Sequence, residues 1–458
     1  MLSIIALLPG FLAAYIALVR SPQQAFLSVY LPCLLLLPDY YRWIAPGLPD
    51  PTFSQAAVVG VAAVFFLRGA PGYRFSFTDV LVFGFAFSVG YSEYLASGYS
   101  DAQNLIFNML AWVMLPYLLA KSLVEPAGLR VVFARRIVWL LFILAIISVY
   151  EFKFGMTPWR RFLDPFFPGQ GRGWVTTFRW GFARVAGPYG HAILAGIVFV
   201  VGYRLQRWLE WSGAWEPKIK HLSWLPLTKA RLITLGVLGG ALMTMVRGPW
   251  IGGFLGAIVV AIGRARNRAA AAGAALALLV AVGVPGGVVF IDYVSVGREN
   301  AQTVAQESAA YRWELIQKYM DIALEKSTWG WGVNDWPKVK GMPSIDNYYL
   351  LLFLMHGLMG LGFLVTLFLY QITRLFIHTL SQPPPQPSGS SLGFTLLGIY
   401  VAIAFSIATV FMGLQVMPLL FIIAGWTDGY LRSGLEGAGV PQTASAPAPP
   451  FRFRRVLT

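Results

Sequence analysis

Residues 347–370 read NYYLLLFLMHGLMGLGFLVTLFLY, and no charged side chain interrupts them. A helix that crosses the hydrocarbon core of a bilayer needs roughly 20 mostly apolar residues, so this stretch is long enough to span a membrane. Comparable runs recur along the chain, about twelve or thirteen in all. They cover residues 2–19, 24–38, 55–67, 79–96, 104–120, 137–152, 187–203, 232–246, 249–263, 270–291, 347–370, 392–412 and 414–430.

The composition also indicates a membrane protein. The chain has 458 residues, of which 57% are hydrophobic and only 12% are charged, with a mean hydropathy of +0.63. A soluble domain is about 45–50% apolar and about 25% charged, so charge this sparse cannot cover a soluble surface. We therefore predict an all-α polytopic membrane protein. Its one cysteine, Cys33, allows no internal disulfide, and its four histidines have no metal-ligand spacing, so we predict no metal site and no cofactor.

The distribution of lysine and arginine predicts the orientation in the membrane. If the predicted helices alternate in direction, 21 of the 35 basic residues fall on one side, and 12 of the other 14 lie in two long loops, 153–186 and 292–346. Short loops carry the topological signal, so the 21-residue side is expected to be cytoplasmic, together with the C-terminus. The two long loops are then periplasmic. The net charge of +15 needs no nucleic-acid partner, because most of it is this positive-inside excess.

The long loops suggest a division into three parts. Residues 1–136 are expected to form N-terminal transmembrane helices, and residues 137–430 a catalytic membrane domain that carries both loops. Residues 431–458 form a basic tail rich in proline and alanine. Neither an internal repeat of 20–50 residues nor a convincing inverted pair of broken helices is visible in the sequence.

Loop 153–186 combines positive charge with aromatic side chains. Six basic residues face the single acid Asp164, and ten aromatic rings lie within or next to the loop. Arginine grips phosphate oxygens in pairs, and aromatic rings suit both the bilayer interface and the faces of sugars. The loop thus suits an anionic lipid headgroup that carries a glycan. For Arg160 or Arg161 taken singly, an ordinary interfacial anchor is the better interpretation.

Arg247 lies between two apolar runs, at the tip of a tight helical hairpin. An arginine near a membrane core is unfavourable by about 2.5–3.5 kcal/mol on insertion scales, and it is retained where it meets an anion or lines a water-filled cavity. The alternative is that its side chain extends to the outer headgroups, which Gly248 and Pro249 would make easy.

Loop 292–346 has mixed charge and is predicted to fold as a small helical lid. Residues 308–326 show the apolar spacing of a helix, with Ser308 as its N-cap. Arg312 would then lie in the first turn, where a cation opposes the helix dipole and calls for an anionic partner. A salt bridge to one of the nearby carboxylates is an equally good explanation.

The end of the lid leads back into the membrane. Gly330 and Gly332 allow tight backbone around Trp331, and Asp346 is the natural N-cap of the next helix. At 100° per residue Asp346 shares a face with Gly357 and Gly360, which predicts close helix packing and an inward-facing carboxylate. His356, in the same span, is expected to hydrogen-bond to a neighbouring helix.

These patterns resemble those of the O-antigen ligase and polymerase superfamily, bacterial enzymes that handle glycans linked to polyprenyl diphosphates. The ligase motif is His-Asn, nine residues, Gly, two residues and Gly. Asn347, Gly357 and Gly360 fit it, with Asp346 in place of the histidine. That departure resembles the polymerases and exopolysaccharide-type members more than the core ligases.

Three further elements carry the resemblance across roughly residues 130–425. The family's Arg-rich helix and Gly-x-Gly loop resemble the stretch from Arg312 to Gly332, and its Ser-Arg-Gly element resembles 246–248, with valine in place of serine. Its Arg-x-x-Gly-x-(Phe/Tyr) element resembles 184–189, followed by His191. Arg179 and Gly190 match an Arg, ten residues, Gly spacing of O-antigen polymerases.

The resemblance implies a metal-independent, inverting glycosyl transfer from an undecaprenyl-diphosphate-linked glycan to a sugar hydroxyl. Arg184 and Arg247 would hold the diphosphate and stabilise it as the leaving group. Asp346 would orient the acceptor hydroxyl and take its proton, acting mainly by positioning because an aspartate is ordinarily a weak base, with a pKa of about 3.9. The predicted substrate-binding residues are Arg312, Arg179, Arg172, Asn347, His191 and Trp331.

The implied location is the bacterial inner membrane, and the implied partners are the lipid-linked glycan, membrane lipid and other polysaccharide-assembly proteins. Polymerisation of O-antigen or exopolysaccharide repeat units is favoured over ligation to lipid A-core. A flippase or transporter of lipid-linked oligosaccharides is an alternative from another class, but repeated halves and mid-span charges would be expected of it. A non-enzymatic member of an export complex would not need arginines at hairpin tips facing an aspartate.

Overall fold

The computed structural model describes residues 2–174, 176–217, 227–342, 344–382, 391–413 and 416–433. It is 74% helical with almost no strand, which confirms the all-α polytopic class. Every predicted apolar run contains a helix. Within the described residues, seven helices are long and apolar enough to cross a membrane: Leu2–Val19, Phe77–Leu123, Arg130–Phe154, Ala192–Trp211, Arg268–Ser295, Tyr348–Ser381 and Leu392–Thr409. The other predicted spans correspond to helices of at most 18 residues beside them.

The N-terminal half consists of helices joined by short connections. Thr52 begins one of them with a capping box, in which its side chain and that of Gln55 satisfy each other's backbone N–H groups. Gly98, with φ +77°, bends the 47-residue helix Phe77–Leu123, whose second limb packs back on the first. The elements are η1 (Leu2–Leu7), α1 (Leu8–Val19), α2 (Pro22–Ala25), η2 (Phe26–Tyr30), α3 (Leu31–Leu36), α4 (Phe53–Leu67), α5 (Phe77–Asn108), η3 (Met109–Met114), α6 (Leu115–Leu123) and α7 (Arg130–Phe154).

The C-terminal half contains the two long connections. The first, after α7, holds α8 (Pro158–Leu163), η4 (Gln170–Gly173), η5 (Gly187–Tyr189) and a hairpin of β1 (Phe178–Arg179) and β2 (Phe182–Ala183). The second holds α13 (Val304–Glu325). The remaining helices are α9 (Ala192–Trp211), α10 (Lys229–Met243), α11 (Arg247–Arg264), α12 (Arg268–Ser295), α14 (Tyr348–Ser381), α15 (Leu392–Thr409) and α16 (Met417–Ser433).

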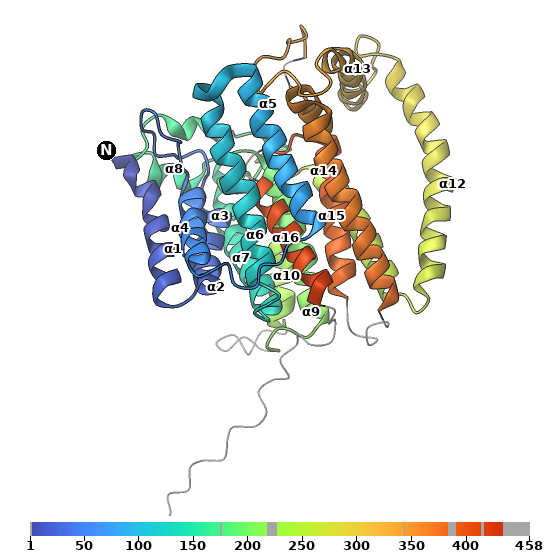
Figure 1. Cartoon of the computed structure of the whole chain (residues 1–458). Helices are drawn as coiled ribbons and strands as arrows, with labels where there is room; N and C mark the ends of the chain where they lie inside the picture. The colour runs from blue at the N-terminus through green and yellow to red at the C-terminus, as the bar shows by residue number, and fades with distance from the viewer. Residues whose placement is uncertain are drawn as a thin grey trace, which may run out of the picture.

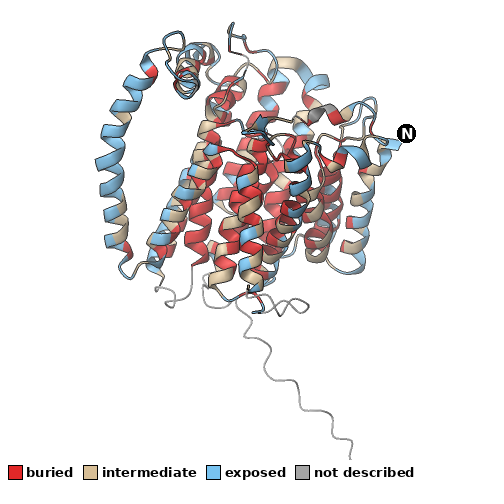
Figure 2. Ribbon diagram, turned by 180° about the vertical axis from the view of Figure 1, so that it is seen from behind, coloured by how far each residue is buried: buried red, intermediate tan, exposed pale blue. Residues whose placement is uncertain are grey.

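Both long connections lie at the same end of the helix bundle (Figure 1), which we call the lid side. α8 and α13 mark this end, whereas the connection between α11 and α12 lies at the opposite end. One large apolar core runs through the bundle, with members from Ala13 in α1 to Tyr430 in α16. Figure 2 shows that the buried residues are concentrated in the central helices.

Small residues bring α11 and α15 into close contact. A Cβ added to Gly252 would lie 2.6 Å from the carbonyl oxygen of Ala402, and one added to Gly256 would collide with the carbonyl of Gly398. Such spacing of small residues lets two backbones approach in a membrane, where packing rather than water exclusion drives association. The contact fixes α11, whose first residue is Arg247.

α12 stands apart from the bundle. None of its most apolar 18-residue window is buried, whereas 83% of the corresponding window of α9 is. It lies at the edge of the bundle in both views (Figures 1 and 2) and contacts α11 and α13 near its two ends. Its apolar side chains are exposed around the helix, which is the pattern expected of a helix surrounded by lipid.

A buried ion cluster occupies the opposite end. The Lys121 Nζ lies 2.6 Å from Asp79 Oδ2 and 3.2 Å from Asp428 Oδ2, and all three side chains are at most 2% exposed. Arg432 and Arg374 pair with the same Asp428 carboxylate at 3.0 and 3.6 Å. The cluster ties together the starts and ends of α5, α6, α14 and α16.

Candidate functional site

The lid helix begins earlier than the sequence predicted. α13 starts at Val304 with Thr303 as its N-cap, whose side chain accepts from the backbone N–H of Gln306. The prediction of Ser308 as the cap was therefore wrong, because Thr303 offers the same chemistry one turn upstream. Arg312 is consequently in the third turn of α13, too far from the helix start for its dipole to matter, and its side chain is exposed.

Tyrosines of α13 hold the chain that leads to Asp346. The Tyr311 hydroxyl donates to the carbonyl of Ser344 at 2.6 Å, and the Tyr319 hydroxyl bonds Met342 and Val339. Tyr319 is fully buried in a small apolar core that the lid shares with the start of α14. The lid is thus a folded unit that fixes the approach to Asp346.

Asn347, and not Asp346, caps α14. The Asn347 side-chain oxygen accepts from the backbone N–H groups of Tyr349 and Leu350 at 3.0 and 3.2 Å. The prediction that Asp346 is the N-cap was wrong, because the helix begins one residue later than expected and Asn347 is its N-cap. The Asp346 carboxylate accepts only a 3.3 Å bond from the Ser344 hydroxyl, and no ion pair among the described residues includes it. It is left free to face a cavity.

The glycines of the predicted motif dock a loop onto a break in α14. Gly357 has φ +62° and ψ −166°, which interrupts the helix, and a Cβ there would collide with the backbone at Thr328. The lid backbone fills the break: Trp331 N–H bonds the carbonyl of Leu354 at 2.9 Å, and Leu358 N–H bonds that of Ser327 at 2.7 Å. Gly357 therefore contacts the lid loop and not, as we predicted, a neighbouring helix. The prediction assumed an unbroken helix, and the break at Gly357 ends the helical periodicity.

α5 braces this junction from the other side. The Ser92 hydroxyl lies within hydrogen-bond distance of the carbonyls of Trp329 and Met355, at 2.5 and 3.1 Å, and of His356 Nδ1, at 3.2 Å. Glu93 accepts from the backbone N–H of Val333 at 2.7 Å. The expected bond from His356 to another helix is confirmed.

A β-hairpin brings two predicted arginines to the turn between α10 and α11. Trp180 and Gly181 have φ of +53° and +81°, as a type I′ turn requires, so Arg179 and Arg184 flank a tight hairpin. Arg179 donates to the carbonyl of Met245 at 2.6 Å, and Arg184 to that of Thr244 at 3.3 Å. Burial and the nearby Arg179 charge lower the pKa of Arg184. Two cations held this close favour an anion beside them.

Arg247 follows that turn directly. It is the first residue of α11, its side chain is exposed, and no side chain caps the helix start. Uncapped N–H groups at a helix start and an adjacent arginine together form a favourable place for a phosphate. The sequence elements around Arg184 and Arg247, distant in the chain, are therefore neighbours.

A cavity of about 770 Å³ is lined by two predicted residues, Asp346 and His191, and His191 interacts electrostatically with Arg184, which binds this turn. Its other charged lining residues, Asp39, Arg42 and Lys338, were not predicted. Asp39 and Arg42 come from the connection between α3 and α4, far from any family motif. The signal in the sequence was an aspartate directly after the apolar run 24–38, but its burial could not be read from the sequence.

His191 is electrostatically coupled to both sides of the site. Its Nδ1 accepts from the backbone N–H of Ile193 at 3.2 Å, which leaves Nε2 as the protonated nitrogen of the neutral ring. Burial is the main cause that lowers its pKa; the Arg184 charge adds to this effect, and the Asp346 charge opposes it. His191 is thus a neutral hydrogen-bond donor between a cation and a carboxylate.

Among the described side chains, six predicted site residues are not part of the lining of this cavity: Arg179, Arg184 and Arg247 lie at the turn between α10 and α11, Asn347 caps α14, and Trp331 and Arg312 belong to the lid. The Trp331 indole donates to the carbonyl of Ile322 at 2.8 Å and lies within the lid; Trp336, five residues on, lines the cavity. Arg312 is exposed on α13. The side chain of Arg172 lies outside the described part of the structure.

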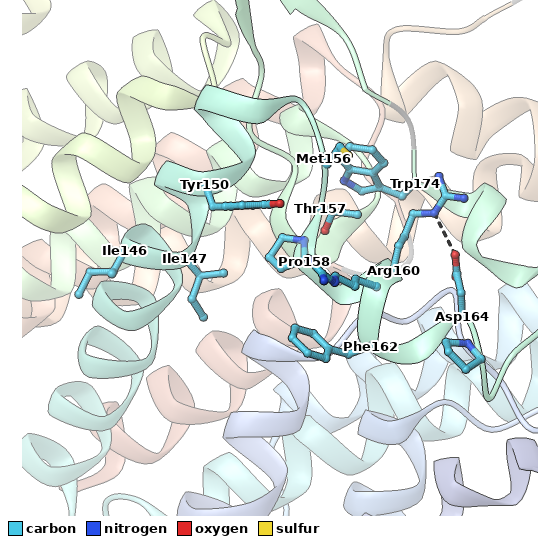
Figure 3. A pocket seen from close by; sticks show the side chains of 12 residues that line it. Ile146, Ile147, Tyr150, Met156, Thr157, Pro158, Arg160, Phe162, Asp164 and Trp174 are labelled. Atoms are coloured by element: carbon cyan, nitrogen blue, oxygen red, sulfur yellow. Dashed lines mark hydrogen bonds and ion pairs between the residues drawn. The ribbon is translucent and has the colours of Figure 1, made fainter.

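A larger hollow of about 980 Å³ lies between α7 and α8 (Figure 3). Ile146, Ile147 and Tyr150 form its α7 side, and Arg160 at its rim pairs with Asp164 at 3.3 Å. Asp164 also accepts from the Tyr41 hydroxyl at 2.6 Å. This hollow faces away from the bundle and contains none of the predicted site residues, so it is a less suitable site for the chemistry.

Comparison with known proteins agrees with the geometry. Residues 232–365 match the O-antigen ligase family model, a segment that runs from α10 into α14. It includes Arg247, Arg312 and Asp346, whereas Arg179, Arg184 and His191 precede it. No curated protein matches the chain. The protein is therefore a polytopic membrane protein whose residues 232–365 match an O-antigen ligase domain, and this match supports the resemblance to the O-antigen ligase and polymerase superfamily.

Proposed function

We propose that the protein polymerises glycan repeat units by transferring a glycan from undecaprenyl diphosphate to a sugar hydroxyl of a second lipid-linked unit. The family match supports the coarser role, that of a glycosyl-transferring membrane protein of polysaccharide assembly that acts on a lipid-linked glycan. The observation that carries the proposal is the cavity lined by Asp346 and His191, of which His191 also interacts electrostatically with Arg184 at the turn between α10 and α11.

The arginines would hold the donor. Arg184 and Arg247 flank the uncapped start of α11, where fixed positive charge meets a diphosphate and stabilises the charge that develops as it leaves. Such a leaving group needs no protonating acid, and the arginines would supply the countercharge, so we propose transfer without a metal cofactor. His191 would donate a hydrogen bond from Nε2 to the lipid-linked glycan that is transferred. Asp346 would orient the attacking hydroxyl.

The proposed orientation places the lid side in the periplasm. Lysines and arginines in short connections are concentrated at the opposite end, as expected of the cytoplasmic side. The proposed location is the bacterial inner membrane. Residues 137–430 remain the proposed catalytic part, although Asp39 and Arg42 from the first 136 residues line the same cavity. The tail from 434 onward lies outside the described residues.

The test uses purified protein in nanodiscs with a synthetic polyprenyl-diphosphate repeat unit, a chelator, and no nucleotide sugar. We expect a ladder of longer glycans. Arg247→Ala should reduce the initial rate by about 10²–10³-fold, through loss of a charge that stabilises the leaving group. Asp346→Ala should reduce it by about 10²-fold, through loss of positioning. Arg161→Ala, an arginine of the α7–α8 hollow, serves as the matched control.

Two results would overturn the proposal. A single transfer that occurs only with a lipid-core acceptor would identify a ligase. No transfer with several repeat units, while the lipid-linked glycan still binds, would favour a transporter. Full activity of Asp346→Ala would remove the role assigned to that residue.

A further inference from the structure

One wall of the cavity comes from residues that neither the family match nor the sequence motifs include. Asp39, Tyr40 and Arg42 lie in the connection between α3 and α4, and Trp112 lies in η3. All four precede the matched segment 232–365. The lining also includes Asp346 and Lys338 from the lid. The cavity therefore has a second charged wall with its own chemistry.

The fold holds this second wall in place. A bridge between Arg42 and Thr52 closes the connection, directly before α4. The Gln170 side chain grips the Arg42 backbone at both polar atoms, accepting from its N–H at 2.7 Å and donating to its carbonyl at 3.1 Å. The Arg42 guanidinium makes no ion pair with any described residue, so its charge remains available to the cavity.

Asp39 is a buried carboxylate with few partners. It is only 4% exposed, and the Ser54 hydroxyl donates to its Oδ1 at 2.9 Å. No ion pair among the described residues includes it. Burying a carboxylate with so little compensation is unfavourable, and such groups concentrate at functional sites.

The surroundings of Asp39 leave it able to take up a proton near neutrality. Burial raises its pKa to about 7, partly offset by Ser54, the Arg42 charge and Thr52. A general base is most effective when its pKa lies near the working pH. The titratable groups around it are Tyr30, Cys33 and Tyr189 within the bundle, and Arg42, His191, Lys338 and Asp346 around the cavity.

Two polar side chains of the same wall have no hydrogen-bond partner. The Trp112 indole Nε1 and the Tyr40 hydroxyl are both buried and unpaired within the described structure, and both residues line the cavity. Trp112 is 1% exposed and lies in a π-helical stretch, a local distortion common at functional sites. Unsatisfied donors beside aromatic rings match a sugar, which offers hydroxyl acceptors and an apolar face.

We propose that this wall binds the acceptor sugar and that Asp39 accepts the proton of the attacking hydroxyl. This inference rests on the proposed function. The hydroxyl oxygen forms a bond to the anomeric carbon of the donor sugar while the bond from that carbon to the diphosphate oxygen breaks. The diphosphate leaves with the bonding pair, and the hydroxyl proton passes to the Asp39 carboxylate and then to water. Asp346, which the lid contributes to the same cavity, positions the acceptor and does not take the proton.

The main experiment compares pH profiles of transfer. The wild-type rate should rise tenfold per pH unit up to about pH 7 and level off above it. Asp39→Asn should reduce the plateau rate by about 10²–10⁴-fold and abolish this rise, with donor affinity unchanged. Asp50→Asn is the matched control, because Asp50 lies in the same connection, bonds Asn104 and does not line the cavity.

A second variant separates proton transfer from folding. Ser54→Ala removes the hydroxyl that lowers the Asp39 pKa, so the rise should move to higher pH while the plateau rate stays within about threefold of wild type. A purely structural role for Asp39 predicts no such displacement. The assignment would be overturned if Ser54→Ala left the pH dependence of the transfer rate unchanged. It would also be overturned if the rate of Asp39→Asn still rose with pH up to about pH 7.

Direct binding tests the wall without catalysis. The probe is a lipid-free repeat-unit oligosaccharide, titrated calorimetrically against the protein in nanodiscs. Trp112→Phe keeps a ring but removes the N–H donor, and it should weaken binding about threefold to tenfold. Unchanged oligosaccharide affinity would overturn the acceptor subsite, whereas absence of any glycan transfer by the wild type would overturn the proposed function and leave this binding result standing.

Discussion

The two ends of the bundle hold charge in opposite ways. At the end away from the lid, Lys121 is buried between Asp79 and Asp428, and each charge is neutralised by a partner within about 3 Å. On the lid side, Arg179 and Arg184 bind backbone carbonyls, and the Asp346 carboxylate has only a hydroxyl partner. In the first arrangement the charges neutralise one another and join helices. In the second the charges have no counterion among the described residues and can interact with a substrate.

The lid side is assembled by backbone contacts instead. The loop from Ser327 to Gly332 bonds the opened turn of α14 at Gly357, and Ser92 bridges loop and helix. Hydrogen bonds between neutral groups can fix geometry without using any carboxylate or guanidinium. Ion pairs also occur within the lid, where Arg298 contacts Glu314 at 3.1 Å, but Asp346, Arg179 and Arg184 are held by neutral groups, and this distinguishes the candidate site from the cluster around Lys121.

Breaking the paired cluster should have the largest effect on stability. Lys121→Met leaves Asp79 and Asp428 buried without their shared cation, which should destabilise the fold by about 3–5 kcal/mol. The thermal unfolding midpoint in detergent measures this. Adding Asp79→Asn to the same protein should restore part of the loss, because Asp79 loses its Lys121 partner whereas Asp428 keeps Arg432 and Arg374. Activity per folded molecule should not change, and a loss of activity at unchanged stability would contradict the comparison.

A side chain at Gly357, where the break in α14 receives the lid loop, should affect mainly the activity. Gly357→Ala forces a Cβ against the backbone of Thr328 at a positive φ, so the loop must shift. A displacement of about 1 Å at a site can reduce a rate 10²-fold. Limited proteolysis of the lid and the initial transfer rate report the two consequences. Gly362→Ala is the control on the same helix, since its added Cβ meets no atom within 4 Å; equal effects of both variants would refute the role of the docked loop.

The smallest effect is expected for an exposed lid charge. Arg312→Ala should change the unfolding free energy by less than about 0.5 kcal/mol, as is usual for a surface residue. If Arg312 meets the donor, KM should rise about threefold to tenfold with kcat unchanged. Lys318→Ala, on the same helix but paired with Glu314 at 3.5 Å, is the comparison. Identical KM values in both variants would exclude Arg312 from the donor site.

Much of the fold was predictable because apolar length alone specifies a membrane helix. Helix starts were less so: Ser308 and Asp346 are good caps, but Thr303 and Asn347 lie nearby and took those positions. Gly357 and Gly360 were identified correctly as special but assigned to helix packing, because a helical projection cannot reveal a break in the helix.

The candidate site was predictable only in part for a similar reason. Asp346, Arg184, Arg247 and His191 carry recognisable motifs, and the structure places Arg184 against the turn before Arg247, and His191 and Asp346 in the lining of one cavity. Asp39 belongs to no motif. Its importance depends on burial and on contact with residues far along the chain, which periodicity and spacing do not encode.

The isolation of α12 makes the bilayer itself a component of the lid. Its 28 residues extend about 42 Å, more than a hydrocarbon core of about 30 Å, so the helix must tilt or bend to match the membrane. With little packing to fix that tilt, membrane thickness sets it, and nine residues after α12 ends the chain enters α13. Because α13 is itself docked on α14, a thinner or thicker membrane would change the tilt of α12 between two anchored ends, which makes α12 the helix whose geometry the surrounding lipid determines.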